Sequence, residues 1–489
     1  MSNITKLFVK STKNFSRSFS RKTVDPSYLK ISPETKITTL SNGIRVATEQ
    51  TYGEVASVGV WVDSGSVYET DKNNGVAHFL EHMIFKGTAK RPTPQSIETE
   101  IENMGGSLNA FTSREHSAYY MKVLKDNVPN AVDILSDILQ NSKFETSLIE
   151  QERDTILSEN DYIQSKEDEV VFDQLHAAAF QGSALGRTIL GPVENIKSIT
   201  REQIQEFINE NYTGDRLVIS AAGAVNHEQL VEQVKEKFAN VKMSQVSKDV
   251  KRAAITNDFI GSELRVRDDE QPLIHFAVAV RALPWTDPDY FVLELIQTMI
   301  GNWNRGIAAG KNIASNLGEI VATEDLAESY STFFTCYQDT GLFGNYGVCQ
   351  PERVDDLVAE MLKEWQRIAT SCNKNEVERN KQKLLATTLM QYDGTSKVCE
   401  GIGRQILTLG RRLSPFEVYT RINEITVADV QRVASTLLRD VSPAVTAIGP
   451  IANYPDYNFV KGWTYTTRVV VKNSISILMF VGKNLVTFL

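Results

Sequence analysis

The stretch His78-Phe79-Leu80-Glu81-His82 reads H-x-x-E-H, and the rest of the sequence is interpreted around it. On a helix, residues four positions apart share a face, so His78 and His82 can point at one ion. Glu81 lies close enough to act on a water molecule bound there. A hydrolytic zinc site needs three protein ligands and an open position for that water. The pentapeptide therefore supplies two ligands and a candidate general base, and the third ligand must come from elsewhere.

This order of residues is the inverted form of a zinc-hydrolase signature. The chain contains only six histidines, so the pattern rarely arises by chance. The alternative is a pair of histidines that are solvated or satisfied within the core. If zinc is bound, it lowers the pKa of its water toward ~7. Glu81 would then take the proton of the water and pass it to the leaving amine.

A candidate third ligand lies in residues 145–181, which contain neither Gly nor Pro and predict one long helix, with or without a kink. Ser147 and Glu150 predict a capping box at its start. Glu152 and Glu159 are seven residues apart and would share a face. One could bind the metal while the other orients a ligand from behind, and the spacing does not decide between them. A run of acids on a helix is otherwise typical of a solvated face, and the other glutamates offered as ligands here are Glu150, Glu167 and Glu169.

Composition and charge restrict the class of protein. A chain of 489 residues exceeds what one hydrophobic core usually serves, so at least two domains are expected. The net charge of −9 argues against nonspecific nucleic-acid binding and suits a basic ligand. None of the four cysteines forms a C-x-x-C pair, so a cysteine zinc site or a disulfide framework is not expected.

The N-terminus differs in composition from the rest of the chain. Its first acid is Asp25, and the residues before it are rich in Lys, Arg, Ser and Thr. This composition is typical of a mitochondrial transit peptide, with a mature start expected near Ser20. A disordered basic tail is the alternative. Residues 1–30 are therefore set aside as transit peptide and leader.

The second half of the chain repeats the order of the first. The alternating segment Val55–Val62 predicts a strand, and a helix follows at about 76–85. Residues 273–280 predict a second strand, followed by a turn and a helix over Tyr290–Ile300. Residues 293–297 stand where the His motif would fall and contain no His. This indicates a duplicated domain that kept the metal site in one copy.

These motifs resemble the pitrilysin/insulinase superfamily of zinc peptidases over about residues 31–465. The resemblance rests on Gly-Val-Ala-His-Phe-Leu-Glu-His-Met at 75–83, Phe-Lys-Gly-Thr at 85–88, and the segments 101–105, 108–115, 152–154 and 339–344. Within the superfamily, the chain is similar to the metal-bearing subunits of two-subunit peptidases that remove mitochondrial presequences. Since the His motif is intact, the resemblance implies a catalytic zinc endopeptidase.

The resemblance also implies the roles of particular residues. Glu159 would be the third ligand of one zinc ion per chain, and Glu152 the supporting carboxylate. Glu169 and Asp173, one turn apart on the long helix, would hold the arginine two residues before the cut. Phe85 would contact the residue after the cut. Asn109 and Ala110 would lie on an edge strand that pairs with extended substrate.

The implied fold is α+β, with two similar domains that face each other across a cavity. Each domain would have a mainly antiparallel sheet with helices on one side. The expected divisions are 1–30 (leader), 31–245 (zinc-binding domain), 246–262 (linker), 263–466 (inactive homologous domain) and 467–489 (a tail with no counterpart in the family). Residues 468–489 are too interrupted by charge to predict a membrane span.

The resemblance implies a homologous α subunit as partner, presequence peptides as substrates, and the mitochondrial matrix as location, with or without association with the inner membrane. An alternative function is a core structural subunit of respiratory complex III, which has the same fold and can be the same polypeptide. A general peptide-degrading relative is a third interpretation, but such chains are about twice as long.

Overall fold

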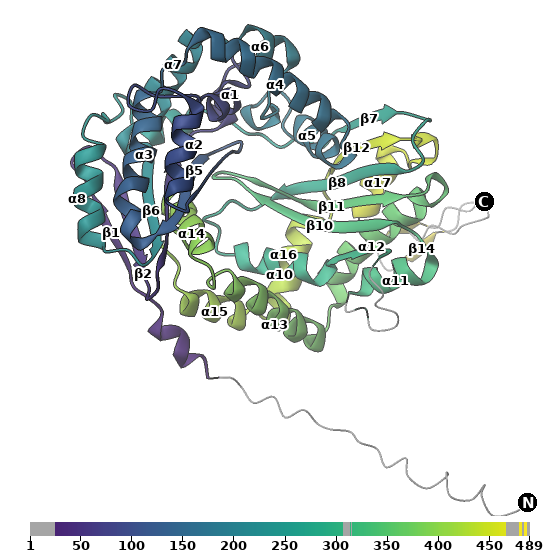
Figure 1. Cartoon of the computed structure of the whole chain (residues 1–489). Helices are drawn as coiled ribbons and strands as arrows, with labels where there is room; N and C mark the ends of the chain where they lie inside the picture. The colour runs from purple at the N-terminus through teal and green to yellow at the C-terminus, as the bar shows by residue number, and fades with distance from the viewer. Residues whose placement is uncertain (1–24, 307–312, 314, 466–478, 482–483, 487–489) are drawn as a thin grey trace, which may run out of the picture.

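The computed structural model describes residues 25–306, 313, 315–465, 479–481 and 484–486, and it places them in two halves (Figure 1). The first half is built on a six-stranded sheet in the order β1-β2-β6-β3-β5-β4. Its only parallel pair is β2 with β6. The strands in chain order are β1 (Thr35–Thr39), β2 (Arg45–Gln50), β3 (Val55–Val62), β4 (Ser107–Thr112), β5 (Ser117–Leu124) and β6 (Leu217–Gly223).

The second half is built on a six-stranded sheet in the order β7-β12-β8-β11-β10-β9. Here too one pair is parallel, β7 with β12, and the remaining pairs are antiparallel. The order from β2 to β4 in the first sheet matches the order from β7 to β10 in the second. The strands are β7 (Glu263–Arg267), β8 (Ile274–Ala282), β9 (Asn302–Asn304), β10 (Ser329–Cys336), β11 (Gly341–Cys349) and β12 (Ala444–Gly449). The repeat expected from the sequence is therefore present in the strand order.

The helices follow the same repeated order around the sheets. In the first half they are α1 (Val76–Met83), α2 (Pro94–Asn103), α3 (Val128–Asn141), α4 (Thr146–Gln164), α5 (Glu167–Ala179), α6 (Val193–Ser198), α7 (Arg201–Asn211) and α8 (His227–Lys237). In the second half they are α10 (Tyr290–Ile300), α11 (Asn316–Glu324), α12 (Val354–Ser371), α13 (Lys374–Met390), α14 (Thr395–Leu409), α15 (Pro415–Glu424), α16 (Val427–Leu438) and α17 (Tyr457–Thr464). With its mixed sheets and these helices, the chain has the α+β fold of two similar domains.

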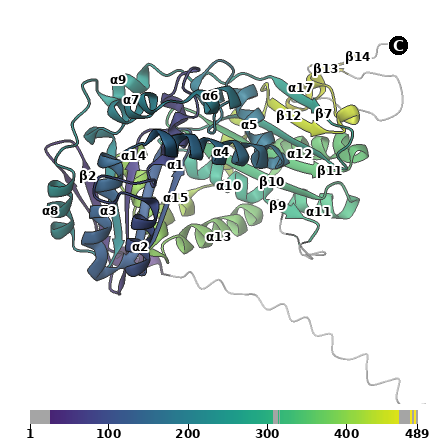
Figure 2. The same ribbon diagram turned by 45° about the horizontal axis from the view of Figure 1, so that its top comes forward.

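Two helices cross from one half to the other. α5 packs on β12 and β8 of the second sheet, while α14 packs on β3 and β6 of the first (Figures 1 and 2). On the side of α14, Ile402 and Ile406 lie in an apolar cluster with Trp61 of β3. Each sheet therefore carries helices of its own half on one face, as expected, and one helix of the other half on the opposite face.

This exchange ties the two halves together energetically. α5 buries Val171 and Leu175 against the second sheet, and α14 buries Ile402 and Ile406 against the first. Each such side chain contributes roughly 1.5–3 kcal/mol. Four of them give a contribution comparable with the whole stability of a typical protein, about 5–15 kcal/mol. The halves are therefore not expected to unfold independently.

Residues 145–181 are expected from the sequence to form one long helix, with or without a kink, but they form two separate helices. α4 ends at Gln164, Lys166 takes an extended conformation with φ −109° and ψ 101°, and α5 then begins. The absence of Gly and Pro permits a helix but does not force it to continue. The break lets α5 turn its apolar face onto the second sheet. The capping box is also wrong, because α4 begins after Glu145 without a side-chain cap.

The segment between the halves is more ordered than a polar linker suggests. It contains the short helix α9 (Lys248–Ala253), and Arg252 pairs with Glu115 of the first half and with Asp339 of the second at 3.0 Å. Burial raises the pKa of Glu115 to about 7, although Arg252 opposes this shift. The segment therefore holds a buried ionic contact between the halves.

The expected leader and the expected tail lie largely outside the described residues. Of the expected leader, only residues 25–30 are described, and they enter a 3-10 helix, η1 (Pro26–Ile31). Of the expected tail, the described part is the hairpin β13 (Met479–Val481) and β14 (Asn484–Val486). No helix within the described ranges has the length and apolar character needed to span a membrane.

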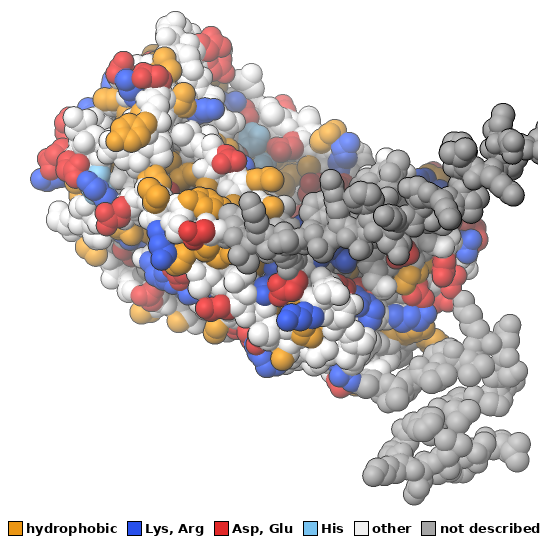
Figure 3. All heavy atoms as spheres, turned by 90° about the horizontal axis from the view of Figure 1, so that it is seen from below, with side chains coloured by type: hydrophobic (Ala, Val, Ile, Leu, Met, Phe, Trp, Pro, Cys, Tyr) orange, Lys and Arg blue, Asp and Glu red, His pale blue; other side chains and the backbone are white. Residues whose placement is uncertain are grey.

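The face in Figure 3 carries acidic and basic side chains together, so the net charge of −9 forms no continuous acidic surface there.

The exchanged helix α14 offers a matched pair of glycine substitutions. A Cβ on Gly403 would lie 2.2 Å from Cδ1 of Trp61, whereas a Cβ on Gly401 would lie 2.7 Å from the end of Arg412, which borders a cavity and has room to shift. We expect Gly403→Ala to lower the free energy of unfolding by about 1–3 kcal/mol, through overpacking against Trp61. Gly401→Ala should be neutral or stabilising, because alanine favours the helix by about 1 kcal/mol. Chemical denaturation of both variants measures the difference, and equal stabilities would contradict the packing described.

Candidate metal centre

The structure brings together the three side chains that the sequence singled out as ligands. His78 and His82 lie one turn apart on α1, with ring centroids 4.8 Å apart. Glu159 reaches them from α4, which packs against α1. Its Oε2 lies 3.2 Å from Nε2 of His82 and 3.7 Å from Nε2 of His78. One ligand atom from each residue lies within 4.8 Å of the others, which is the arrangement required to hold one cation.

The start of α1 is fixed by a glycine and a buried carboxylate. Gly75 precedes the helix with φ 102°, and a Cβ there would lie 2.5 Å from the carbonyl oxygen of Leu190. Glu69 accepts hydrogen bonds from the backbone N–H groups of Gly75 at 2.9 Å and Ala77 at 2.7 Å. Burial raises the pKa of Glu69 to about 7, although these hydrogen bonds favour its charged form. Glu69 thus supports the helix that carries both histidines, a role the sequence did not indicate.

Glu152 lies behind His82, where the sequence allowed a supporting carboxylate. Nδ1 of His82 lies 2.9 Å from Oε1 of Glu152, and Nζ of Lys86 lies 2.6 Å from Oε2. Burial alone would raise the pKa of Glu152, but its bonds to His82 and Lys86 outweigh burial and lower it. A carboxylate on Nδ1 directs Nε2 toward the cation position, as is usual for metal-binding histidines. Lys86 was not predicted, and only its place just after the motif could have indicated it.

The two imidazoles differ in protonation. Burial, aided by the positive charge of His82, lowers the pKa of His78 to about 4. Burial also acts to lower the pKa of His82, but the contacts with Glu152 and Glu159 outweigh it and raise the pKa to about 9. Metal binding at His82 must therefore release a proton.

The donor set fits a catalytic zinc ion. Two imidazole nitrogens and one carboxylate oxygen are a known ligand set of hydrolytic zinc, which leaves a fourth position for water. Oε2 of Glu159 is buried and makes no hydrogen bond of normal geometry to any described residue. A bound cation would satisfy this atom.

Glu81 lies on the same helix, half-buried beside strand β4. Burial raises the pKa of its carboxyl group, while the side chain and backbone N–H of Thr112 donate hydrogen bonds to it. Thr112 is the last residue of β4. The carboxylate that is suited to proton transfer is therefore attached to the end of an edge strand.

The residues expected to touch a peptide lie around this strand. β4 is at the edge of its sheet, and Asn109 and Ala110 pair with Tyr120 and Tyr119 of β5 on one side. No strand of the described chain pairs with the other side of β4, so that side is open to an added strand. Phe85, just beyond α1, is partly buried against the first core.

The expected acidic pair is found on α5 and not on the helix of Glu152 and Glu159. Glu169 is exposed in the first turn of α5. Asp173 is one turn further on, with Oδ1 2.6 Å from Nη2 of Arg114 and Oδ2 2.9 Å from Oγ1 of Thr188. Asp173 is therefore already paired, and Glu169 is the acid of the two that faces solvent. Arg114 lies within the segment 108–115 that carried the family resemblance, but its partner could not be known from sequence.

Comparisons with known proteins agree with this site. Residues 45–193 match the sequence family "Insulinase (Peptidase family M16)", and residues 198–384 match "Peptidase M16 inactive domain". The chain is 99% identical over 469 residues to the mitochondrial-processing peptidase subunit beta of Dictyostelium discoideum, covering 96% of this chain and 100% of that protein. It is 47% identical over 426 residues to the subunit beta of Bos taurus, covering 87% of this chain and 86% of that protein.

A solved structure shares the fold. A chain of complex III2 from Candida albicans, determined with Inz-5 bound, is similar with a TM-score of 0.79 and 25% sequence identity. The match covers 88% of this chain and 100% of that chain.

The contact between Glu152 and His82 predicts a specific effect on metal affinity. We expect Glu152→Ala to weaken zinc binding by roughly 10–100-fold, because His82 loses the group that orients its ring. Asp154→Ala, an exposed acid on the same helix, should leave the affinity unchanged and is the control. Competition with a chromogenic chelator measures both affinities. Equal affinities in the two variants would show that Glu152 does not support the site.

Proposed function

Because this chain belongs to the insulinase family of peptidases, peptidase family M16, we propose that it is the zinc-bearing catalytic subunit of an endopeptidase that removes presequences from mitochondrial precursor proteins. Membership of this family makes the chain a metallopeptidase, and the names of its relatives indicate the mitochondrion. One observation carries the finer proposal. His78, His82 and Glu159 meet at one point, and Glu81 lies between that point and an open edge strand.

The proposed chemistry divides the work among these residues. A zinc ion held by His78, His82 and Glu159 would supply a Lewis acid and lower the pKa of a bound water toward ~7. Glu81 takes the proton of the attacking water and delivers it to the leaving amine. Thr112 holds the carboxylate of Glu81 in place while the proton is transferred. Glu152, supported by Lys86, keeps the His82 ring in its orientation.

The proposed substrate lies along β4 as an added strand. Asn109 and Ala110 offer the open edge to its backbone, and Phe85 contacts the residue after the cut. Glu169 receives the guanidinium of the arginine two residues before the cut. Asp173 is paired with Arg114, so its contribution to the same site is to fix the geometry of the acidic pair.

A basic presequence suits a chain with a net charge of −9. The relatives are called subunit beta, which supports a homologous α subunit as the partner in a heterodimer. The matrix follows as the place of action, since precursors are processed as they arrive there, and the basic residues 1–30 would be the transit peptide of this chain.

A second function, as a core subunit of respiratory complex III, is favoured by one observation. The structural neighbour named above is a chain of that complex and covers 88% of the present chain. Copurification with cytochromes from native membranes would support this function, alone or beside the peptidase activity. The converged zinc ligands are not needed for a purely structural role, so catalysis is the primary proposal.

Glu81→Gln tests the catalytic proposal directly. This variant should bind one zinc ion per chain with wild-type affinity, because Glu81 is not a ligand. It should cleave an arginine-containing presequence peptide at least roughly a thousandfold more slowly, because the proton acceptor is lost. Cleavage is measured with and without an α-type partner, and zinc is measured on the same samples. Wild-type cleavage by the variant would refute the role of Glu81, and an absence of zinc from the wild-type chain would refute the ligand set.

The acidic pair on α5 yields a second test. Glu169→Gln should raise KM for an arginine-bearing peptide roughly tenfold, because one charge-assisted hydrogen bond is lost. It should leave both the Tm and the cleavage of a matched peptide with Gln in place of Arg unchanged.

Asp173→Asn should in addition lower the Tm, because the buried Arg114 loses its charged partner. If Glu169→Gln affected both peptides equally, Glu169 would not be the arginine site.

A further inference from the structure

The two halves correspond helix by helix as well as strand by strand. Each sheet is followed by helices in the same order, so α1, α4 and α5 correspond to α10, α13 and α14. The contacts agree, because α5 crosses to the second sheet as α14 crosses to the first, and α1 packs on α4 as α10 packs on α13. The elements that carry His78, Glu159 and Glu169 therefore have three counterparts in the second half.

Those counterparts surround a cavity. It has a volume of about 580 Å³ and is lined by residues of α10, α13, α14 and α15 and of the turn before α10. This size lies within the range of cavities that bind small organic molecules. α10 carries no histidine, so the cavity lacks the ligands of the first half and has a chemistry of its own.

Cations dominate one side of this cavity. Five basic side chains line it: Lys397, Arg404, Arg411, Arg412 and Arg421. The carboxylates that pair with them are either shared by two of these groups or are not lining residues. Glu400 is shared by Lys397 and Arg404. Glu417 is shared in the same way by Arg411 and Arg421 and, like Glu49, is not a lining residue. The five basic groups are therefore paired with three carboxylates, Glu400, Glu417 and Glu49.

Two of these guanidinium groups have free donors. The side chain of Arg412 is only 7% exposed and is held by Nε on Glu49 at 2.9 Å and by stacking over Tyr392 at 5.1 Å. No described residue accepts a hydrogen bond from its terminal nitrogens. Nε of Arg404 is buried and likewise has no partner among the described residues. A buried donor such as Nε of Arg404 is normally satisfied, so an acceptor in the cavity that also reaches the terminal nitrogens of Arg412 would complete both groups.

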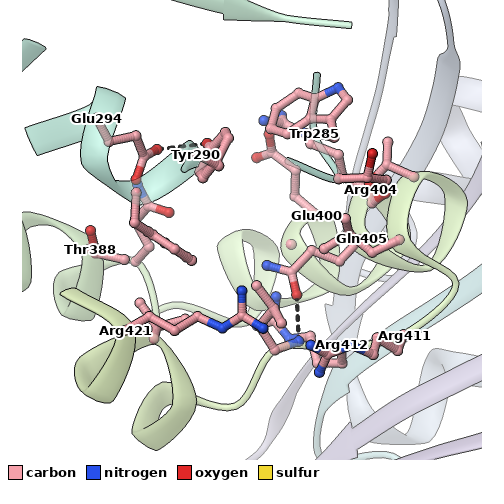
Figure 4. A pocket seen from close by; sticks show the side chains of 18 of the residues that line it. Trp285, Tyr290, Glu294, Thr388, Glu400, Arg404, Gln405, Arg411, Arg412 and Arg421 are labelled. Carbon is pink, nitrogen blue, oxygen red and sulfur yellow. Dashed lines mark hydrogen bonds and ion pairs between the residues drawn. The ribbon is translucent and has the colours of Figure 1, made fainter. Parts of the chain in front are cut away.

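The opposite side of the cavity is mainly aromatic, and its two acids, Asp287 and Glu294, form no ion pair with these cations. Figure 4 shows Trp285, Tyr290 and Glu294 across the pocket from Arg412. Trp285 and Tyr290 stack with centroids 5.7 Å apart, and the hydroxyl of Tyr290 donates to Glu294 at 2.6 Å. Burial raises the pKa of Glu294 to about 7, and none of the basic residues above pairs with it. Glu294 is the acid of α10, as Glu81 is of α1, but α10 has no histidine beside it.

We propose that this cavity is a second ligand site, in the position that corresponds to the metal centre of the first half, and that it binds a small organic oxyanion. A phosphate or carboxylate group accepts from Arg404 and Arg412, and the planar or apolar body of the ligand lies against Trp285 and Tyr290. Guanidinium groups bind such oxyanions through paired, charge-assisted hydrogen bonds. No chemical step is assigned to the site.

The test is calorimetric titration of the zinc-loaded full-length chain with inorganic phosphate and with phenyl phosphate. Both share the headgroup, and phenyl phosphate adds a ring. We expect both to bind and phenyl phosphate to bind more tightly, through stacking on the aromatic side. Repeating the titration after zinc removal separates this site from the metal, since binding in the cavity persists without zinc.

Three variants make the result specific. Arg404→Met should weaken both anions roughly tenfold or more, through loss of a charged donor. Arg412→Lys should do the same while keeping a charge opposite Glu49, because lysine lacks the planar pair of donors. Arg267→Met, which removes an exposed cation paired with Asp269, is the control and should bind as the wild type does. An absence of binding by the wild type, loss of binding on zinc removal, or equal affinities in all the variants would overturn the proposal.

Discussion

The reciprocal packing of α5 and α14 is the constraint on which the rest of the structure depends. Each helix belongs to one half by sequence and covers the sheet of the other. The apolar residues that it buries could not be covered otherwise, since both faces of β3 and of most of β8 are buried. Because α5 is held on the second sheet, Glu169 and Asp173 are displaced from the line of α4 toward the space between the halves. The reciprocal packing therefore fixes where α5, with the acidic pair, lies relative to α4, which carries Glu159.

The metal centre is supported by a series of charged groups that lie behind its ligands. Lys86 holds Glu152, Glu152 orients His82, and Glu69 fixes the start of the helix. Such supports matter because three ligands from two helices bind a cation tightly only when their side chains are held in place beforehand. Thr112 at the end of β4 donates hydrogen bonds to Glu81, so Glu81 is attached to a strand whose other side is unpaired among the described residues.

The duplication explains both what the halves share and where they differ. The same arrangement of helices recurs in α1, α4 and α5, which carry the candidate metal ligands and the acidic pair, and in α10, α13 and α14, which line the second cavity. In the first half histidines and acids lie on these helices, which favours a cation. In the second half arginines and aromatic residues do so, which favours an anion with an apolar body. The backbone thus determines where a site can form, and the side chains determine the charge of what it holds.

The sequence by itself indicated the two histidines of the metal centre, the order of most strands and helices, and the repeat, because these follow from local spacing and hydrophobic period. It allowed Glu152 or Glu159 as the ligand, and only tertiary packing placed Glu159 between the imidazoles and Glu152 behind His82. It predicted one helix over 145–181, since no residue there forbids one, yet burial on a distant sheet broke it at Lys166. The pairing of Asp173 with Arg114, the support from Lys86 and Glu69, and the second cavity were decided by the tertiary structure alone. Each of these depends on contacts between residues far apart in the chain, for which local spacing carries no information.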